Sequence, residues 1–142
     1  MKQQRYCGVI VKCGNKVLLC KRSTEGSYPG MWSIPCGKLE KGETTKDGAK
    51  REFFEETSVD IDDMNITFVG LIPRHSKDGK KIKGIMYVYL LEVKDIIEPD
   101  FDLAIDGHEH SDWKYFGLEQ IDENTTGKKL CKMLKILLKE KK

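Results

Sequence analysis

Apolar residues along the chain fall into short runs of strand type that are separated by turn residues. Gly14-Asn15, between the first two runs, is typical of a tight hairpin turn. Asp78-Gly79 marks a second turn, within residues 73–80. Loops are expected at residues 23–30 and 94–107. The predicted strands are residues 6–12, 16–21, 66–72 and 82–93, with shorter strands at residues 32–34 and 113–116.

Residues 44–57 have the pattern of a helix. Thr44 is a good helix-start residue, and Gly48 is the only residue before Thr57 that would break a helix. Ala49 and Phe53 share a face with Thr57 and form a stripe that is suited to pack on a core.

A second helix is predicted over residues 128–142, with its lysines in solvent. Strands joined by hairpins and flanked by helices predict an α/β fold, with a mixed β-sheet covered by helices on its faces. The chain has 142 residues and no repeat or linker, so residues 1–142 are expected to form a single domain. The apolar positions of the second helix are Leu130, Met133, Leu134, Leu137 and Leu138.

The first predicted helix carries a cluster of glutamates. Glu52, Glu55 and Glu56 are three and four positions apart and share one face. Three crowded carboxylates repel one another, and a hard cation such as Mg²⁺, which prefers carboxylate oxygens, would hold them together. Arg51 offers a rigid fork of donors that can orient one of them. A solvated acidic helix is the structural alternative, but the charged, turn-rich loop at residues 35–43 suits an ion or phosphate site.

The spacing of residues 37–59 resembles the signature of the Nudix hydrolases. The one defined position that departs from it is Ser58, where the family has Gly. That residue follows the helix, and a left-handed Ser there would cost about 1 kcal/mol relative to Gly. The resemblance covers roughly residues 6–121 and implies an α/β/α sandwich. The matching positions are Gly37, Glu43, Arg51, Glu52, Phe53, Glu55, Glu56 and Val59.

The resemblance implies that Mg²⁺ or Mn²⁺ assists water attack on a diphosphate bridge. Arg51 would hold the glutamates, and Glu43 and Gly37 would support the loop. Either Glu52 or Glu109 would be the general base. The implied metal ligands are the backbone carbonyl of Cys36 and the carboxylates of Glu52, Glu55, Glu56 and Glu109.

The resemblance also implies substrate contacts from Arg22, Lys38 and Trp32. Two of them have a structural alternative: Arg22 as a surface charge at the end of a strand, and Trp32 as a core residue. His108 and His110 are interpreted as exposed loop residues without a catalytic role. A zinc site formed by these histidines and a cysteine is conceivable, but their spacing fits no structural zinc pattern.

The substrate implied first is a nucleoside triphosphate, cleaved to the monophosphate and pyrophosphate. ADP-ribose and dinucleoside polyphosphates are the alternatives within the enzyme class. Pro73 lies where ADP-ribose enzymes often carry a proline, although a turn would also explain it. A non-catalytic nucleotide-binding module is the alternative of another class, but such modules usually lose the glutamates that this chain keeps.

The composition indicates which binding partners and which cellular compartment to expect. The net charge of +2 gives no reason to expect nucleic-acid binding. No apolar segment is long enough to span a bilayer, and the first residues do not resemble a signal peptide. Five cysteines without a CxxC pair predict reduced thiols in a cytoplasmic protein. The resemblance implies a nucleotide or nucleoside diphosphate derivative as the substrate, and a monomer or homodimer is expected.

Overall fold

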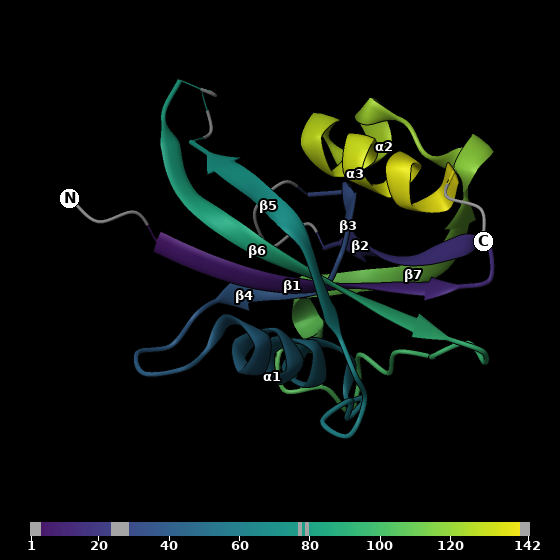
Figure 1. Cartoon of the computed structure of the whole chain (residues 1–142), viewed down its shortest axis with the longest axis horizontal. Helices are drawn as coiled ribbons and strands as arrows, with labels where there is room; N and C mark the ends of the chain where they lie inside the picture. The colour runs from purple at the N-terminus through teal and green to yellow at the C-terminus, as the bar shows by residue number, and fades with distance from the viewer. Residues whose placement is uncertain (1–3, 24–28, 77, 79, 140–142) are drawn as a thin grey trace.

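The computed structural model describes residues 4–23, 29–76, 78 and 80–139. In this part of the chain, seven strands form one mixed sheet, with α1 on one face and α2 and α3 on the other (Figure 1). This is the predicted α/β/α arrangement. The strands are β1 (Gln4–Cys13), β2 (Lys16–Arg22), β3 (Trp32–Ser33), β4 (Cys36–Lys38), β5 (Thr67–His75), β6 (Ile82–Val93) and β7 (His110–Gly117). The helices are α1 (Thr45–Thr57), α2 (Glu123–Thr126) and α3 (Lys128–Lys139), with short 3₁₀ turns η1 (Gly107–Glu109) and η2 (Leu118–Gln120).

β1 is the central organising strand of the sheet. It pairs in parallel with β6 along its whole length, from Gln4 opposite Gly84 to Cys13 opposite Val93. It also pairs antiparallel with β2 and with β4. The remaining strands extend the sheet, because β7 and β3 pair with β2 and β5 pairs with β6. Both predicted hairpins, β1–β2 and β5–β6, are therefore confirmed.

Each face of the sheet has its own apolar core. On one face, Phe53 and Ala49 of α1 pack on side chains of β1, β2 and β6. On the other face, α3 contributes Leu130, Leu134 and Leu137. The two cores explain the nearly continuous apolar runs of β1 and β2, because both faces of these strands are covered. Among the described residues, no helix has both the length and the apolar character needed to cross a membrane.

Several element boundaries differ from the sequence-based expectation. A short strand, β4, lies within the expected loop at residues 35–43, and α2 was not predicted. β5 continues through Pro73 to His75, so Pro73 belongs to a strand and not to a turn. β5 is an edge strand, where a missing N–H is tolerated. The expected turn partner Gly79 and the last residues of the C-terminal helix, 140–142, lie outside the described residues.

α1 begins as predicted. The Thr44 side chain accepts a hydrogen bond from the Asp47 N–H at 3.1 Å and caps the helix. Gly48 lies where the helix approaches its neighbours so closely that little room is left for a side chain. A Cβ at that position would lie 2.6 Å from Leu39 Cδ1 and 2.9 Å from Cys7 Sγ. Gly48 is thus a packing requirement and not a helix break.

α1 ends at Ser58, which has φ 64° and ψ 9°, the left-handed conformation expected at this position. Its N–H donates to the Phe54 carbonyl at 2.8 Å. We expect Ser58→Gly to raise the free energy of unfolding by about 1 kcal/mol without changing turnover, because glycine adopts this conformation without steric cost. Thermal unfolding of the two proteins measures the difference, and a clear loss of stability would contradict the steric argument.

Candidate active site

Arg51 lies at the centre of an acidic cluster formed by α1 and the preceding loop. Its Nε and Nη2 donate to the two carboxylate oxygens of Glu43 at 2.7 and 3.1 Å. Its Nη1 donates to Glu52 at 3.0 Å and to both oxygens of Glu55 at 3.1 Å. Nη2 also reaches the Lys38 carbonyl at 3.0 Å, so one guanidinium ties α1 to β4. The hydrogen bond with Arg51 lowers the pKa of Glu43.

Gly37 leaves room for the carboxylate of Glu52. A Cβ added at Gly37 would overlap both carboxylate oxygens and the carboxyl carbon of Glu52. These atoms belong to a mostly buried side chain that Arg51 holds in place, so they have little freedom to move away. The glycine at this position is therefore required by space.

Glu56 is almost fully buried, with 1% of its surface exposed. Its Oε1 accepts a hydrogen bond from the Cys36 N–H at 3.3 Å. Burial raises the pKa of Glu56 well above its ordinary value, and the nearby carboxylates of Glu109 and Glu52 raise it further. Burial also raises the pKa of Glu52. The helix thus presents carboxylates whose charges disfavour one another, and a cation would relieve that repulsion.

The segment at residues 106–110 brings Glu109 to the acidic helix. The Asp106 N–H donates to the Glu55 carbonyl at 2.7 Å and docks this segment on the last turn of α1. Glu109 Oε1 lies 3.9 Å from Arg22 Nη2, and its backbone carbonyl accepts from the Ser23 N–H at 2.9 Å. The fold therefore unites Glu109 and Arg22, two residues that were predicted for the site from distant parts of the chain.

His110 was interpreted as an exposed loop residue, and that interpretation is wrong. It is 4% exposed at the start of β7, and its ring stacks on Phe101 with centroids 5.5 Å apart. Its Nε2 lies 3.8 Å from Glu56 Oε1, and burial lowers the pKa of its imidazole to about 4. Among the described residues, neither ring nitrogen has a hydrogen-bond partner. His108, in contrast, is exposed.

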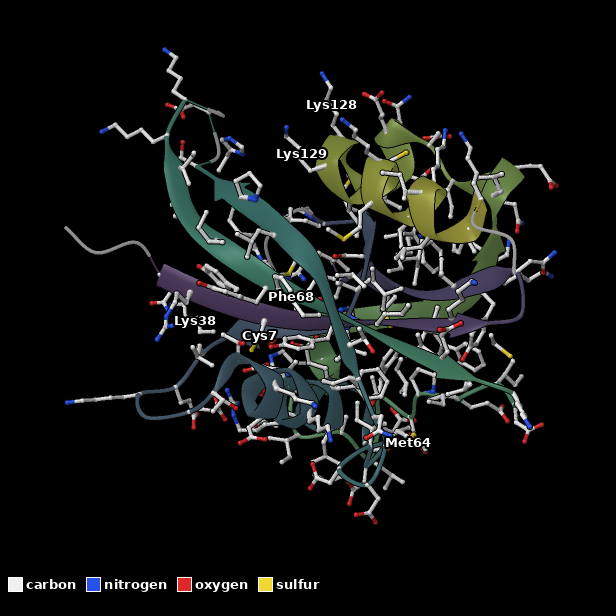
Figure 2. The ribbon with its side chains drawn as sticks, in the orientation of Figure 1. Cys7, Lys38, Met64, Phe68, Lys128 and Lys129 are labelled. Atoms are coloured by element: carbon white, nitrogen blue, oxygen red, sulfur yellow. The ribbon has the colours of Figure 1, made fainter. Side chains whose placement is uncertain are left out.

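The three predicted substrate-binding residues occupy different environments. The Arg22 side chain is mostly buried and forms the ion pair with Glu109. Trp32 packs edge-on against Phe116, with ring centroids 5.0 Å apart, and adjoins the core below α3. Lys38 is exposed at the end of β4, on the side of the acidic helix (Figure 2). Trp32 therefore has a packing role, whereas Lys38 is open to a ligand.

All five cysteines are free thiols, as predicted. Burial raises the pKa of Cys36 to about 11 and that of Cys7 to about 12, so both thiols are protonated near neutral pH. Cys7 lies between the sheet and α1 (Figure 2). The Cys36 Sγ accepts a contact from Arg74 Nη1 at 3.8 Å. Arg74 was not singled out in the sequence, because it lies on β5, outside the signature.

The residues at the acidic helix fit a divalent cation by their chemistry. Within the described segments, no three His, Cys, Asp or Glu side chains already surround a common point. The side chains that α1 offers are nevertheless carboxylates, the donors that Mg²⁺ and Mn²⁺ prefer. Arg51 hydrogen-bonds Glu52 and Glu55, whereas the buried Glu56 faces two further carboxylates. This concentration of negative charge suits a cation.

A mixed sheet between two helical layers, with glutamates on the helix of one layer, defines the class of the domain. The family model described as NUDIX domain matches residues 1–134. The chain therefore belongs to the Nudix family, as the spacing of residues 37–59 predicted. Members of this family act on nucleotide derivatives and generally need divalent metals.

Similar proteins agree with this assignment. The uncharacterized Nudix hydrolase YvcI of Bacillus subtilis is 34% identical over 91 residues, 63% of this chain. The match covers only 54% of that relative, so the chain spans about half its length. The CTP pyrophosphohydrolase of Escherichia coli is 25% identical over 111 residues, 78% of this chain and 73% of that protein. The MutT NUDIX hydrolase of Burkholderia pseudomallei shares the fold, with a TM-score of 0.74, 19% identity and coverage of 96% and 98%.

Proposed function

We propose that the protein is a divalent-metal-dependent hydrolase that cleaves the diphosphate linkage of a nucleoside diphosphate derivative. The favoured substrate is a (deoxy)nucleoside triphosphate, which yields a monophosphate and pyrophosphate. The observation that carries the proposal is the buried carboxylate of Glu56, which is close enough to the carboxylates of Glu52 and Glu109 to be repelled by their charges. The similarity to a CTP pyrophosphohydrolase supports a triphosphate substrate.

Different residues of the site would bind the cation and accept the proton of the attacking water. Glu52, Glu55, Glu56 and the Cys36 carbonyl would hold the cation. When bound, that cation neutralises phosphate charge and lowers the pKa of the attacking water. A carboxylate, Glu52 or Glu109, accepts the proton of that water as its oxygen bonds to phosphorus.

The remaining residues position these groups. Arg51 keeps the helix carboxylates in one arrangement through its fixed fork of donors. Arg22 orients Glu109 through their ion pair, and the exposed Lys38 is placed to contact a phosphate. The electron pair of the broken P–O bond leaves with pyrophosphate, and the proton passes from the carboxylate to solvent.

A panel of nucleotides tests the proposal directly. The purified chain is incubated with Mg²⁺ and, separately, nucleoside triphosphates, nucleoside diphosphates, ADP-ribose and a dinucleoside tetraphosphate, and the products are separated by chromatography. Release of pyrophosphate from a triphosphate, abolished by EDTA and restored by Mg²⁺, is the expected result. Preferred cleavage of ADP-ribose would replace the favoured substrate by an alternative. Binding without any product would replace the enzyme by a nucleotide-binding module.

Glu109→Gln distinguishes the two candidates for the general base. If Glu109 takes the proton, the variant should lose at least about 10²-fold in kcat, with KM changed little. His108→Ala alters the exposed neighbour in the same 3₁₀ turn and should retain nearly full activity. Steady-state kinetics of both variants measures the difference. A nearly silent Glu109→Gln would assign the base to Glu52.

A further inference from the structure

Arg74 projects from the edge strand β5 toward the loop that carries the acidic site. Its Nη1 lies 3.8 Å from Cys36 Sγ. The backbone N–H of the same Cys36 donates to Glu56 Oε1. A single residue therefore separates the Arg74 guanidinium from the most buried carboxylate of the site. A phosphate chain that a cation held at that carboxylate would therefore lie close to Arg74.

Tyr6 holds the guanidinium in place. The Arg74 Cζ lies 4.6 Å from the centroid of the Tyr6 ring, which is the geometry of a cation–π contact. Tyr6 lies on β1, directly opposite Lys38 of β4, so the aromatic support belongs to the same part of the sheet as the site loop. The guanidinium carbon lies over the ring, and the planar group offers several N–H donors.

Unlike the other two arginines near the site, Arg74 has no carboxylate paired with it among the described residues. Arg51 bonds to Glu43, Glu52 and Glu55, and Arg22 pairs with Glu109. Within residues 4–23, 29–76, 78 and 80–139, no carboxylate lies within 4.0 Å of the Arg74 guanidinium. Its contact with a thiol sulfur is weak, because sulfur is a poor acceptor. This guanidinium is available to an anion.

We propose that Arg74 binds a phosphate of the substrate beyond the two phosphates joined by the cleaved linkage. This inference rests on the proposed function, in which the carboxylates of α1 hold the scissile diphosphate through a cation. The remaining anion of a nucleoside triphosphate is its terminal phosphate, and the planar fork of an arginine matches phosphate geometry. Arg74 would thus make the site selective for triphosphates over diphosphates.

Arg74→Ala tests the proposal through substrate preference. We expect the variant to lose about 10-fold or more in kcat/KM for a nucleoside triphosphate, mainly through KM. The value for the matching diphosphate should change less than about 3-fold. Arg74→Lys keeps the charge but not the fork and should fall between wild type and Arg74→Ala. Equal losses for both substrates, or no loss, would overturn the proposal.

A binding measurement separates this proposal from the question of catalysis. Inorganic tripolyphosphate and pyrophosphate are titrated by calorimetry into the protein in the presence of Mg²⁺, and the wild type should bind tripolyphosphate more tightly. Arg74→Ala should abolish that difference, and its persistence would overturn the role of Arg74 even if nucleotides are hydrolysed. If the wild type hydrolyses no nucleotide but Arg74 still sets this preference, only the proposed function fails.

A matched control is available on the same face of the sheet, away from β5, where β7 pairs with β2. Lys114 of β7 lies over the Phe116 ring at 5.3 Å, so it makes the same kind of cation–π contact. Lys114→Ala should leave the preference for triphosphate unchanged. Thermal unfolding of Arg74→Ala, Arg74→Lys and Lys114→Ala shows that each variant is folded. A Lys114→Ala effect equal to that of Arg74→Ala would mean that a general charge effect, and not a site contact, sets the preference.

Discussion

Glu56→Gln is expected to reduce turnover by at least about 10²-fold, the size of effect that follows removal of one key electrostatic group. The amide keeps the shape of the side chain, and its oxygen still accepts from the Cys36 N–H. It lacks the charge that a divalent cation requires. Glu55→Gln should have a loss of similar size, because Glu55 shares the helix face. Steady-state kinetics at saturating Mg²⁺ measures both effects.

Stability gives this prediction a second measurement. In EDTA, Glu56→Gln should unfold at a higher temperature than wild type, because an uncharged amide replaces a carboxylate whose ionisation is disfavoured by burial. Added Mg²⁺ should stabilise wild type by mass action and the variant much less. Glu119→Gln, an exposed change in η2, serves as the control and should alter neither property. Near wild-type turnover in both helix variants would exclude this helix as the active site.

Arg51→Lys is expected to lower turnover about 10²-fold and the free energy of unfolding by about 2 kcal/mol. Lysine keeps the positive charge but cannot bond simultaneously to Glu43, Glu52, Glu55 and the Lys38 carbonyl. The carboxylates would then lose their fixed arrangement, and a small displacement of a catalytic group is costly. Chemical denaturation and initial rates test the two parts separately.

The neighbouring residue on α1 supplies the control for Arg51→Lys. Lys50 donates an exposed hydrogen bond to the Asp62 carbonyl at 2.9 Å, away from the contacts that Arg51 makes with the carboxylates. Lys50→Ala should change the free energy of unfolding by no more than about 0.5 kcal/mol and leave turnover intact. If Arg51→Lys behaves like Lys50→Ala, the carboxylates do not depend on Arg51 for their positions.

The sequence predicted those elements whose signals are local and strong. β6 begins and ends where the run of branched and aromatic residues does, and α1 is bounded by Thr44 and the left-handed Ser58. β4 was missed because Cys-Gly-Lys has no strand pattern, and its extended form comes from pairing with β1. The start of β7 was missed because His110 and the two residues after it are polar. Tertiary pairing decides these cases.

The contacts of the site also fall into those that a local sequence pattern predicts and those that depend on the tertiary fold. The contacts among Arg51, Glu43 and Glu52 follow from the spacing of one loop and one helix, so a local pattern was sufficient to predict them. The position of His110 beside Glu56 depends on how residues 106–110 dock against α1, which no local spacing encodes. Arg74 approaches Cys36 only because β5 joins the sheet through β6.

The contrast between Cys36 and Gly37 bears on how this loop can be engineered. Every other amino acid introduces a Cβ at position 37, where it would overlap the Glu52 carboxylate, so a library at this position should return only glycine among active clones. Cys36 offers its backbone N–H to Glu56, and its side chain fills a small buried space. Substitutions no larger than cysteine, such as serine or alanine, leave the backbone contact in place. A redesign of the site can therefore vary Cys36 but must keep Gly37.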